Sequence, residues 1–185
     1  MLNQNKPLRI AIAGLGFGES VHIPASLSSR KIELVGLWHP RQNRLKEACD
    51  KHNLYAYETW SDLINDSKIE GIIIATPPAP RYKLALEAIK AGKHLLLEKP
   101  TCLNSKEVME LQINALKRNL KIAVDYEYRA VPLFMQAKRI INHKNLDDPF
   151  FVKLDWLMSS RANSSRPWNW YSDVDSGGGV LGALG

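Results

Sequence analysis

The sequence has little cysteine. Cys49 and Cys102 are its only cysteines, and they lie far apart with no CxxC spacing. That argues against a structural zinc site or a disulfide framework and is typical of proteins from a reducing compartment. We therefore predict no metal site and a cytoplasmic location.

Long apolar runs and dense basic blocks are also missing. Residues 72–75 and 95–97 form apolar runs of strand length, whereas a membrane helix needs about 20 apolar residues. The N-terminus lacks the apolar core of a signal peptide. Although the net charge is +6, the basic residues are scattered, so a nucleic-acid-binding module has only net charge in its favour. We expect neither a membrane nor a nucleic acid as partner.

Short apolar segments alternate with amphipathic ones as far as residue 125. Near-continuous apolar runs suit strands that are buried on both faces of a parallel sheet. The expected strands are 8–13, 31–38, 55–57, 70–75, 93–97 and 121–125. Helical patterns follow at 81–90 and 104–116, the second opening with a capping-box-like Asn104 and Glu107. This order predicts an α/β fold with a Rossmann-type doubly wound parallel sheet.

The pattern changes after residue 125. We expect a helix at 132–143, a strand of a second sheet at 150–157 and a loop at 161–175. The predicted helix points Leu133, Ala137, Ile140 and Ile141 inward. A lone strand and loop cannot bury their own apolar faces. We therefore predict a Rossmann domain at 1–126 and, at 127–185, the incomplete beginning of an α+β open-sheet domain.

A glycine-rich turn directly follows the first strand. In dinucleotide-binding domains the first glycine makes the tight turn and the second lets backbone N–H groups approach a pyrophosphate. The helix after the turn adds partial positive charge. Glu19 occupies the third-glycine position of the strict pattern, with Gly18 one place early. The alternative is a plain tight turn. The candidate cofactor contacts here are Gly14, Leu15, Gly16, Phe17, Gly18 and Glu19.

The end of the second strand carries no acidic residue. An aspartate or glutamate there would accept hydrogen bonds from the adenosine ribose. His39 occupies that position instead, and Trp38 could pack near an adenine. Arg41 and Arg44 could face a 2′-phosphate. We predict NADP over NAD; alternatively, both arginines only cover the next helix.

The fourth strand runs into Glu98-Lys99-Pro100. A lysine at the carboxyl end of a parallel strand lies where open α/β sheets bind their ligands. It could hold a substrate oxygen or help to move its proton. Taken alone, a Lys-Pro pair is more often a surface turn.

Several motifs together resemble the Gfo/Idh/MocA oxidoreductase family in order and spacing. They are His22-Ile23-Pro24-Ala25, Ala75-Thr76-Pro77-Pro78, residues 91–100, residues 124–129 and Gly177-Gly178-Gly179. The resemblance implies an N-terminal Rossmann domain and a C-terminal open mixed sheet that often forms dimer contacts. It also implies hydride transfer between NAD(P) and a hydroxyl carbon of a sugar, inositol or related compound. The full-length protein is accordingly expected to be a homo-oligomer with a small-molecule substrate.

The resemblance also assigns roles to residues. It makes Lys99 the catalytic residue beside the nicotinamide, with a cis peptide bond before Pro100. It places Thr76, Pro77, Pro78 and Glu98 along the cofactor, and Tyr126, Arg129 and the loop from Trp168 to Tyr171 at the substrate. The sequence departs from the family at two positions. Ala183 replaces an aspartate that, with a histidine four residues later, usually works with the lysine, and Arg81 replaces a common histidine.

The sequence thus predicts an NAD(P)-dependent oxidoreductase, with NADP preferred. The alternative is a non-catalytic dinucleotide-binding regulator or scaffold of the same fold. The position of the partner histidine would fall just beyond Gly185. We therefore expect these 185 residues to bind cofactor without turning over.

Overall fold

The computed structural model describes residues 6–142, 150–153, 155, 157, 165 and 167–179. The chain divides into two compact units. One comprises Met1–Asp125 with Trp170–Gly185, and the other Tyr126–Asn169. The domain boundary predicted at 126/127 stays a prediction. The sequence did not predict that residues 170–179 belong to the first unit.

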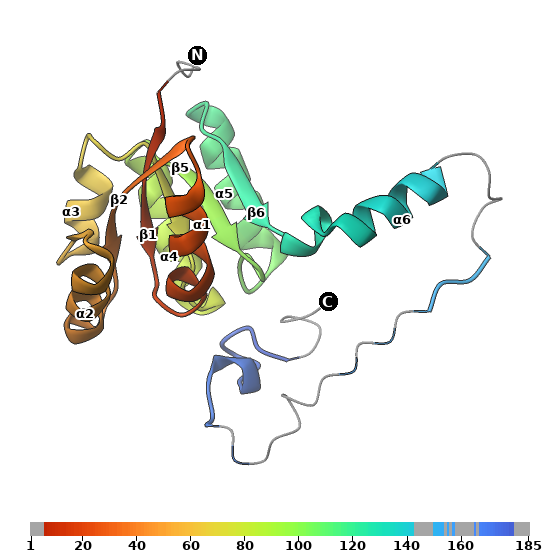
Figure 1. Ribbon diagram of the computed structural model, residues 1–185. Coiled ribbons are helices and arrows are strands. Elements are labelled where there is room, and N and C mark those ends of the chain that lie inside the picture. Colours follow the sequence, from red (N-terminus) through yellow and green to blue (C-terminus); the bar gives the residue numbers. More distant parts are fainter. Residues whose placement is uncertain are drawn as a thin grey trace. The chain divides into compact units, whose positions relative to one another are not determined.

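The first unit is built on a sheet of six parallel strands in the order β3-β2-β1-β4-β5-β6 (Figure 1). Strand numbers rise in both directions away from β1, which is the order of a doubly wound Rossmann sheet and confirms the predicted fold. The strands are β1 (Leu8–Ala13), β2 (Ile32–Trp38), β3 (Tyr55–Ala56), β4 (Gly71–Ile74), β5 (His94–Glu98) and β6 (Ile122–Asp125).

Helices connect these strands. After β1 a π-helical turn (Gly18–His22) continues into α1 (Ile23–Ser28). The others in this unit are α2 (Gln42–His52), α3 (Trp60–Asn65), α4 (Pro78–Lys90), α5 (Ser105–Lys117) and a 3-10 turn (Trp170–Ser172). As predicted, Asn104 caps α5: its Oδ1 accepts the N–H of Glu107 at 3.1 Å. The start of α4 precedes the predicted residue 81, because a first helical turn tolerates proline.

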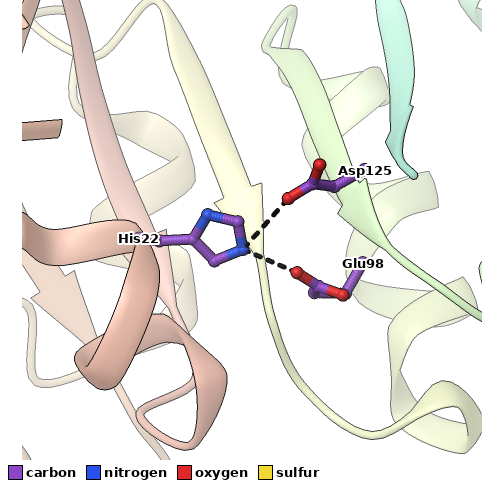
Figure 2. Close-up of side chains that lie close together, drawn as sticks. All are labelled: His22, Glu98 and Asp125. Atoms are coloured by element: carbon purple, nitrogen blue, oxygen red, sulfur yellow. Dashed lines mark hydrogen bonds and ion pairs between the residues drawn. The ribbon is translucent and has the colours of Figure 1, made fainter. Parts of the chain in front are cut away.

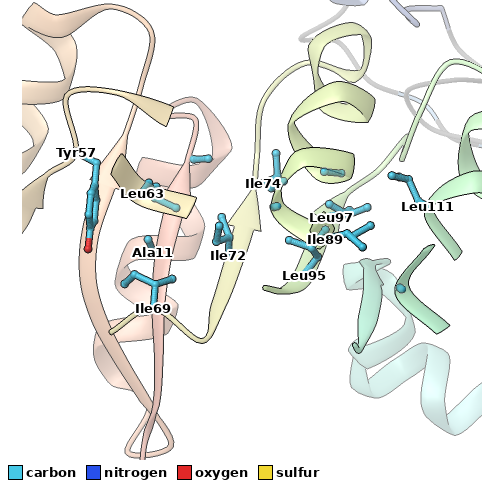
Figure 3. Packing of buried hydrophobic residues seen from close by; sticks show 14 of the residues in the cluster. Ala11, Tyr57, Leu63, Ile69, Ile72, Ile74, Ile89, Leu95, Leu97 and Leu111 are labelled. Carbon is cyan, nitrogen blue, oxygen red and sulfur yellow. The ribbon is translucent and has the colours of Figure 1, made fainter. Parts of the chain in front are cut away.

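Alternate residues of the strands serve two hydrophobic layers. Ala11 and Ala13 of β1 point into a core that also contains buried side chains of α3, α4 and α5 (Figure 3). Ile10 and Ile12 point to the other face, against residues of α1 and α2. Both faces of the central strands are therefore covered, which explains why their sequences are almost continuously apolar.

The second unit contains a 3-10 turn (Glu127–Ala130) and α6 (Pro132–Asn142). The predicted helix is present, but the expected inward burial is not: Leu133 is 79% exposed and Ile141 56%. An apolar stripe needs a facing layer, and the described residues of this unit supply none. No strand occurs among the described residues of 150–157, since a strand needs a partner for hydrogen bonding. None of the helices in the described ranges is long and apolar enough to cross a membrane.

The buried position of Leu97 gives a test of the core. Leu97 on β5 is 0% exposed, whereas Leu116 on α5 is 70% exposed. Leu97→Ala should lower the free energy of unfolding by about 2–5 kcal/mol, because it leaves a cavity. The matched control Leu116→Ala should change it by less than about 0.5 kcal/mol. Urea unfolding followed by circular dichroism measures both, and equal losses would contradict this assignment of the core.

Candidate functional site

A cavity of about 790 Å³ opens at the carboxyl ends of the strands in the first unit. Most of the predicted cofactor contacts line it: Gly14, Leu15, Gly16, Phe17, Trp38, His39, Arg41, Arg44, Thr76, Pro77, Glu98 and Lys99. Residues that were not singled out from the sequence line it too, among them Trp60, Lys83, Leu84 and Glu87. Because all strands are parallel, their carboxyl ends meet at one edge of the sheet, and the crevice lies where strand order diverges.

The glycine turn packs directly on the end of β4. Gly14 has a φ of +99°, and a Cβ there would lie 2.7 Å from the carbonyl carbon and oxygen of Ala75. Only glycine fits such a position without moving the backbone. At Gly16 a Cβ would meet nothing within 4 Å. That open space lets a ligand approach the main chain.

Three predicted cofactor contacts, Gly18, Glu19 and Pro78, do not line the cavity. Gly18 lies against β1, where a Cβ would approach Ile12 Cγ2 at 3.1 Å. Glu19 turns toward α2, and its carboxylate accepts a hydrogen bond from Lys51 Nζ at 2.9 Å. This bond and nearby positive charge lower the pKa of Glu19. Whether these residues touch a cofactor stays a prediction.

His39 sits at the end of β2 and is 9% exposed. Its Nδ1 accepts the backbone N–H of Arg41 at 3.1 Å, and burial lowers the pKa of His39. Nearby, Arg44 Nη2 donates to the carbonyl of Leu15 at 3.3 Å and lies 3.5 Å from Glu19 Oε2. The edge of the cavity is therefore positively charged, but Glu19 partly neutralises Arg44.

Two tryptophans meet at the same end of the cavity. The ring centroids of Trp38 and Trp60 are 5.2 Å apart with an interplanar angle of 57°. Trp60 was missed, although Thr59 signals a helix start there: its Oγ1 accepts the N–H of Asp62 at 3.0 Å. Nothing in the spacing could have placed Trp60 beside Trp38, which precedes it by a whole strand-helix unit.

Lys99 follows β5 and is half-buried at the cavity wall. The predicted cis peptide bond between Lys99 and Pro100 is present. Glu98 precedes it with a buried carboxylate, whose Oε2 accepts the N–H of Lys99 at 3.2 Å. Both residues therefore line the same cavity as the glycine turn.

Glu98 is also held from the opposite side. Figure 2 shows His22 pointing between Glu98 and Asp125, with its Nε2 at 2.7 Å from Glu98 Oε1 and 3.8 Å from Asp125 Oδ2. The three ligand atoms lie within 4.8 Å of one another, close enough for a metal ion. A hydrogen bond from His22 to a carboxylate, however, needs the proton on Nε2, which leaves that nitrogen no lone pair for a metal. The absence of a metal site stays a prediction.

Two features of this site test whether a dinucleotide fits. Thr76 Oγ1 is buried at the cavity wall and has no hydrogen-bond partner among the described residues. Buried hydroxyls are normally paired, so a ligand oxygen or nitrogen would complete it. The open backbone at Gly16 leaves room for phosphates. The residues present therefore fit a bound dinucleotide.

The predicted substrate contacts Tyr126, Arg129 and Trp168 belong to the second unit, so their role stays a prediction. The same predicted loop contributes Trp170 and Tyr171 to the cavity from the first unit. Their rings stack with centroids 3.9 Å apart. An aromatic wall thus faces the cavity.

The sheet order, the glycine turn and the cavity define a dinucleotide-binding α/β protein. Residues 8–126 match the oxidoreductase family with an NAD-binding Rossmann fold, Gfo/Idh/MocA. The chain belongs to this family, which confirms the resemblance found in the sequence. Its cofactor is a nicotinamide dinucleotide.

Relatives and solved structures agree with this assignment. An uncharacterized oxidoreductase of Synechocystis sp. is 36% identical over 99% of this chain and 50% of its own length. Glucose-6-phosphate 3-dehydrogenase of Bacillus subtilis is 26% identical over 96% of this chain and 50% of its own. An NAD-binding protein from Listeria innocua superposes with a TM-score of 0.71 at 26% identity, covering 76% of this chain and 41% of that one. The chain spans about half the length of the curated relatives it matches.

The two glycines should respond differently to alanine. Gly14→Ala places a methyl group against the Ala75 backbone at a positive φ, so it should cost at least about 2 kcal/mol of stability as well as cofactor affinity. Gly16→Ala, which meets no protein atom, should keep stability within about 1 kcal/mol. It should still weaken NADPH binding about tenfold, because the methyl group occupies the approach to the main chain. Thermal unfolding and fluorescence titration check this, and unchanged NADPH affinity in Gly16→Ala would contradict the site.

Proposed function

We propose that the protein containing this chain is an NADP-dependent oxidoreductase acting on a sugar, polyol or related hydroxy or carbonyl compound. The observation that carries the proposal is that Lys99 lines the same cavity as the open backbone at Gly16. A proton-transferring group and a dinucleotide cradle thereby share one cavity. The dehydrogenase name of the Bacillus subtilis relative supports the substrate class.

The bound dinucleotide supplies hydride transfer. Lys99 Nζ would hold the substrate oxygen and take its proton in oxidation, and it would return a proton to that oxygen in reduction. Glu98 holds the main chain of Lys99 through its N–H, and the aromatic pair Trp170 and Tyr171 helps to exclude water from the cavity.

The preference for NADP is supported by the chemistry of His39. His39 Nδ1 lies 3.1 Å from the backbone nitrogen of Arg41 and 3.4 Å from its carbonyl oxygen. In the tautomer in which Nδ1 accepts the shorter of these bonds, the ring proton resides on Nε2, which becomes a donor. A donor suits the oxygens of a 2′-phosphate, whereas the usual carboxylate would accept from ribose hydroxyls and repel a phosphate. The exposed Arg41 adds positive charge at this end of the cavity. We further propose that this enzyme is cytoplasmic, forms a homo-oligomer and has no nucleic-acid partner.

Exchange at His39 tests the cofactor preference. The chain should bind NADPH about tenfold or more tightly than NADH, since hydrogen bonds to charged groups contribute about 1.5–3 kcal/mol. His39→Asp keeps an acceptor for the Arg41 N–H but presents negative charge, so it should reverse the preference. The control His39→Asn keeps both acceptor and donor and should retain it. Nicotinamide fluorescence titrations measure the ratio, and equal or tighter NADH binding by the unaltered chain would overturn the proposal.

Removal of the lysine amine separates an enzyme from a regulator. In the protein that contains this chain, Lys99→Ala should lower turnover by about 10²–10⁴-fold, the usual contribution of a positioned acid-base group. NADPH affinity should change only a few-fold. Lys90→Ala, an exposed position in the last turn of α4, is the matched control. Steady-state rates with candidate polyols check this, and full turnover without the Lys99 amine would favour the regulator.

A further inference from the structure

Among the residues that the structure describes, Arg81 is the largest fully buried side chain, with an exposed fraction of 2%. It projects from the first turns of α4. Its guanidinium donates to the carbonyl oxygens of Thr76, Glu98 and Pro100. These belong to the segment after β4, the last residue of β5 and the segment beyond it. One side chain therefore ties together the two chain segments that meet at the cavity.

Two of these three carbonyls flank Lys99 in sequence. Arg81 holds the carbonyl of the preceding residue and that of the following residue, while the Glu98 carboxylate accepts the Lys99 N–H. The main chain before, at and after Lys99 is thus fixed by hydrogen bonds. The third carbonyl, that of Thr76, ties this segment to a residue that also lines the cavity.

Burial of a charged guanidinium costs free energy of solvation, and two properties of Arg81 reflect this cost. Desolvation lowers the pKa of Arg81 to about 10. Its Nε is buried without a partner among the described residues. If the site needed only filling, an apolar side chain of similar volume would avoid this cost. A planar fork with several donors is, however, able to bridge carbonyls from three places at once, which a single ammonium group does poorly.

We propose that Arg81 is a positioning residue for Lys99: it fixes the Lys99 main chain to the end of β4, so that the amine meets the reacting oxygen in one defined place. Its importance for turnover rests on the function proposed above. Its effect on Lys99 does not, and can be measured on this chain alone.

The direct test monitors the main-chain N–H of Lys99 by nuclear magnetic resonance after selective ¹⁵N labelling of the lysines. The Lys99 signal is identified by its loss in Lys99→Arg. Arg81→Lys should shift or split this signal, because an ammonium cannot hold both flanking carbonyls and that of Thr76 together. The signal of Lys93, buried at the other end of β5, should stay in place, as should the far-ultraviolet circular dichroism. An unchanged Lys99 signal would overturn the proposal, and so would equal shifts at Lys93 and Lys99, which mean general loosening.

The turnover arm uses the protein that contains this chain. Arg81→Lys should lower kcat about 10–100-fold while the NADPH dissociation constant changes less than about threefold, as expected for a displaced catalytic group. Should Arg81→Lys fail to fold, Arg81→Gln, which is uncharged and keeps two donors, replaces it in both arms. Unaltered kcat despite a shifted Lys99 signal would overturn the catalytic part of the proposal. Full turnover by Lys99→Ala would instead indicate failure of the proposed function.

Discussion

The backbone of the glycine turn rests directly on the backbone at the end of β4, with no side chain between them. Gly14 makes this contact, donating its N–H to the carbonyl of Trp38 at 3.0 Å while Ala75 donates to that of Ala13 at 2.7 Å. Three strands, β2, β1 and β4, are thereby joined at their carboxyl ends. A Cβ on Gly14 would push these segments apart, and every other part of the site is placed relative to them.

How far the sequence could predict the fold depended on how local each signal was. The strands were predicted within a few residues because burial on both faces demands almost continuous apolar sequence. The start of α5 could be predicted from one capping residue, Asn104. The start of α4 at Pro78 was missed, because two prolines are also typical of a turn. At six residues α3 is too short to show a helical period.

The residues of the site likewise divide into those that local sequence signals could predict and those that they could not. Gly14, Gly16 and Lys99 could be predicted because their chemistry depends on their position directly after a strand, and the strands themselves are evident in the sequence. The contact between His22 and Glu98 joins residues 76 positions apart, so no spacing rule could find it. Glu19 was predicted by its place in a motif, but the basic side chains of α2 compete for its carboxylate. Local patterns identify what the backbone does, whereas side-chain partners depend on the packed structure.

The two lysines at the ends of β5 show why this matters for chemistry. Lys93 donates from Nζ to the carbonyls of Asp66 and Ile69 at 2.8 and 2.7 Å, so its amine is committed to structure, and burial lowers its pKa. At Lys99 the main chain is held by other groups. The Glu98 carboxylate accepts its N–H, and the Arg81 guanidinium donates to the carbonyls on either side of it. The position of the Lys99 backbone is therefore set independently of what its amine contacts. That separation is what a proton-transferring lysine requires, because its amine must change partners while its place in the cavity stays constant.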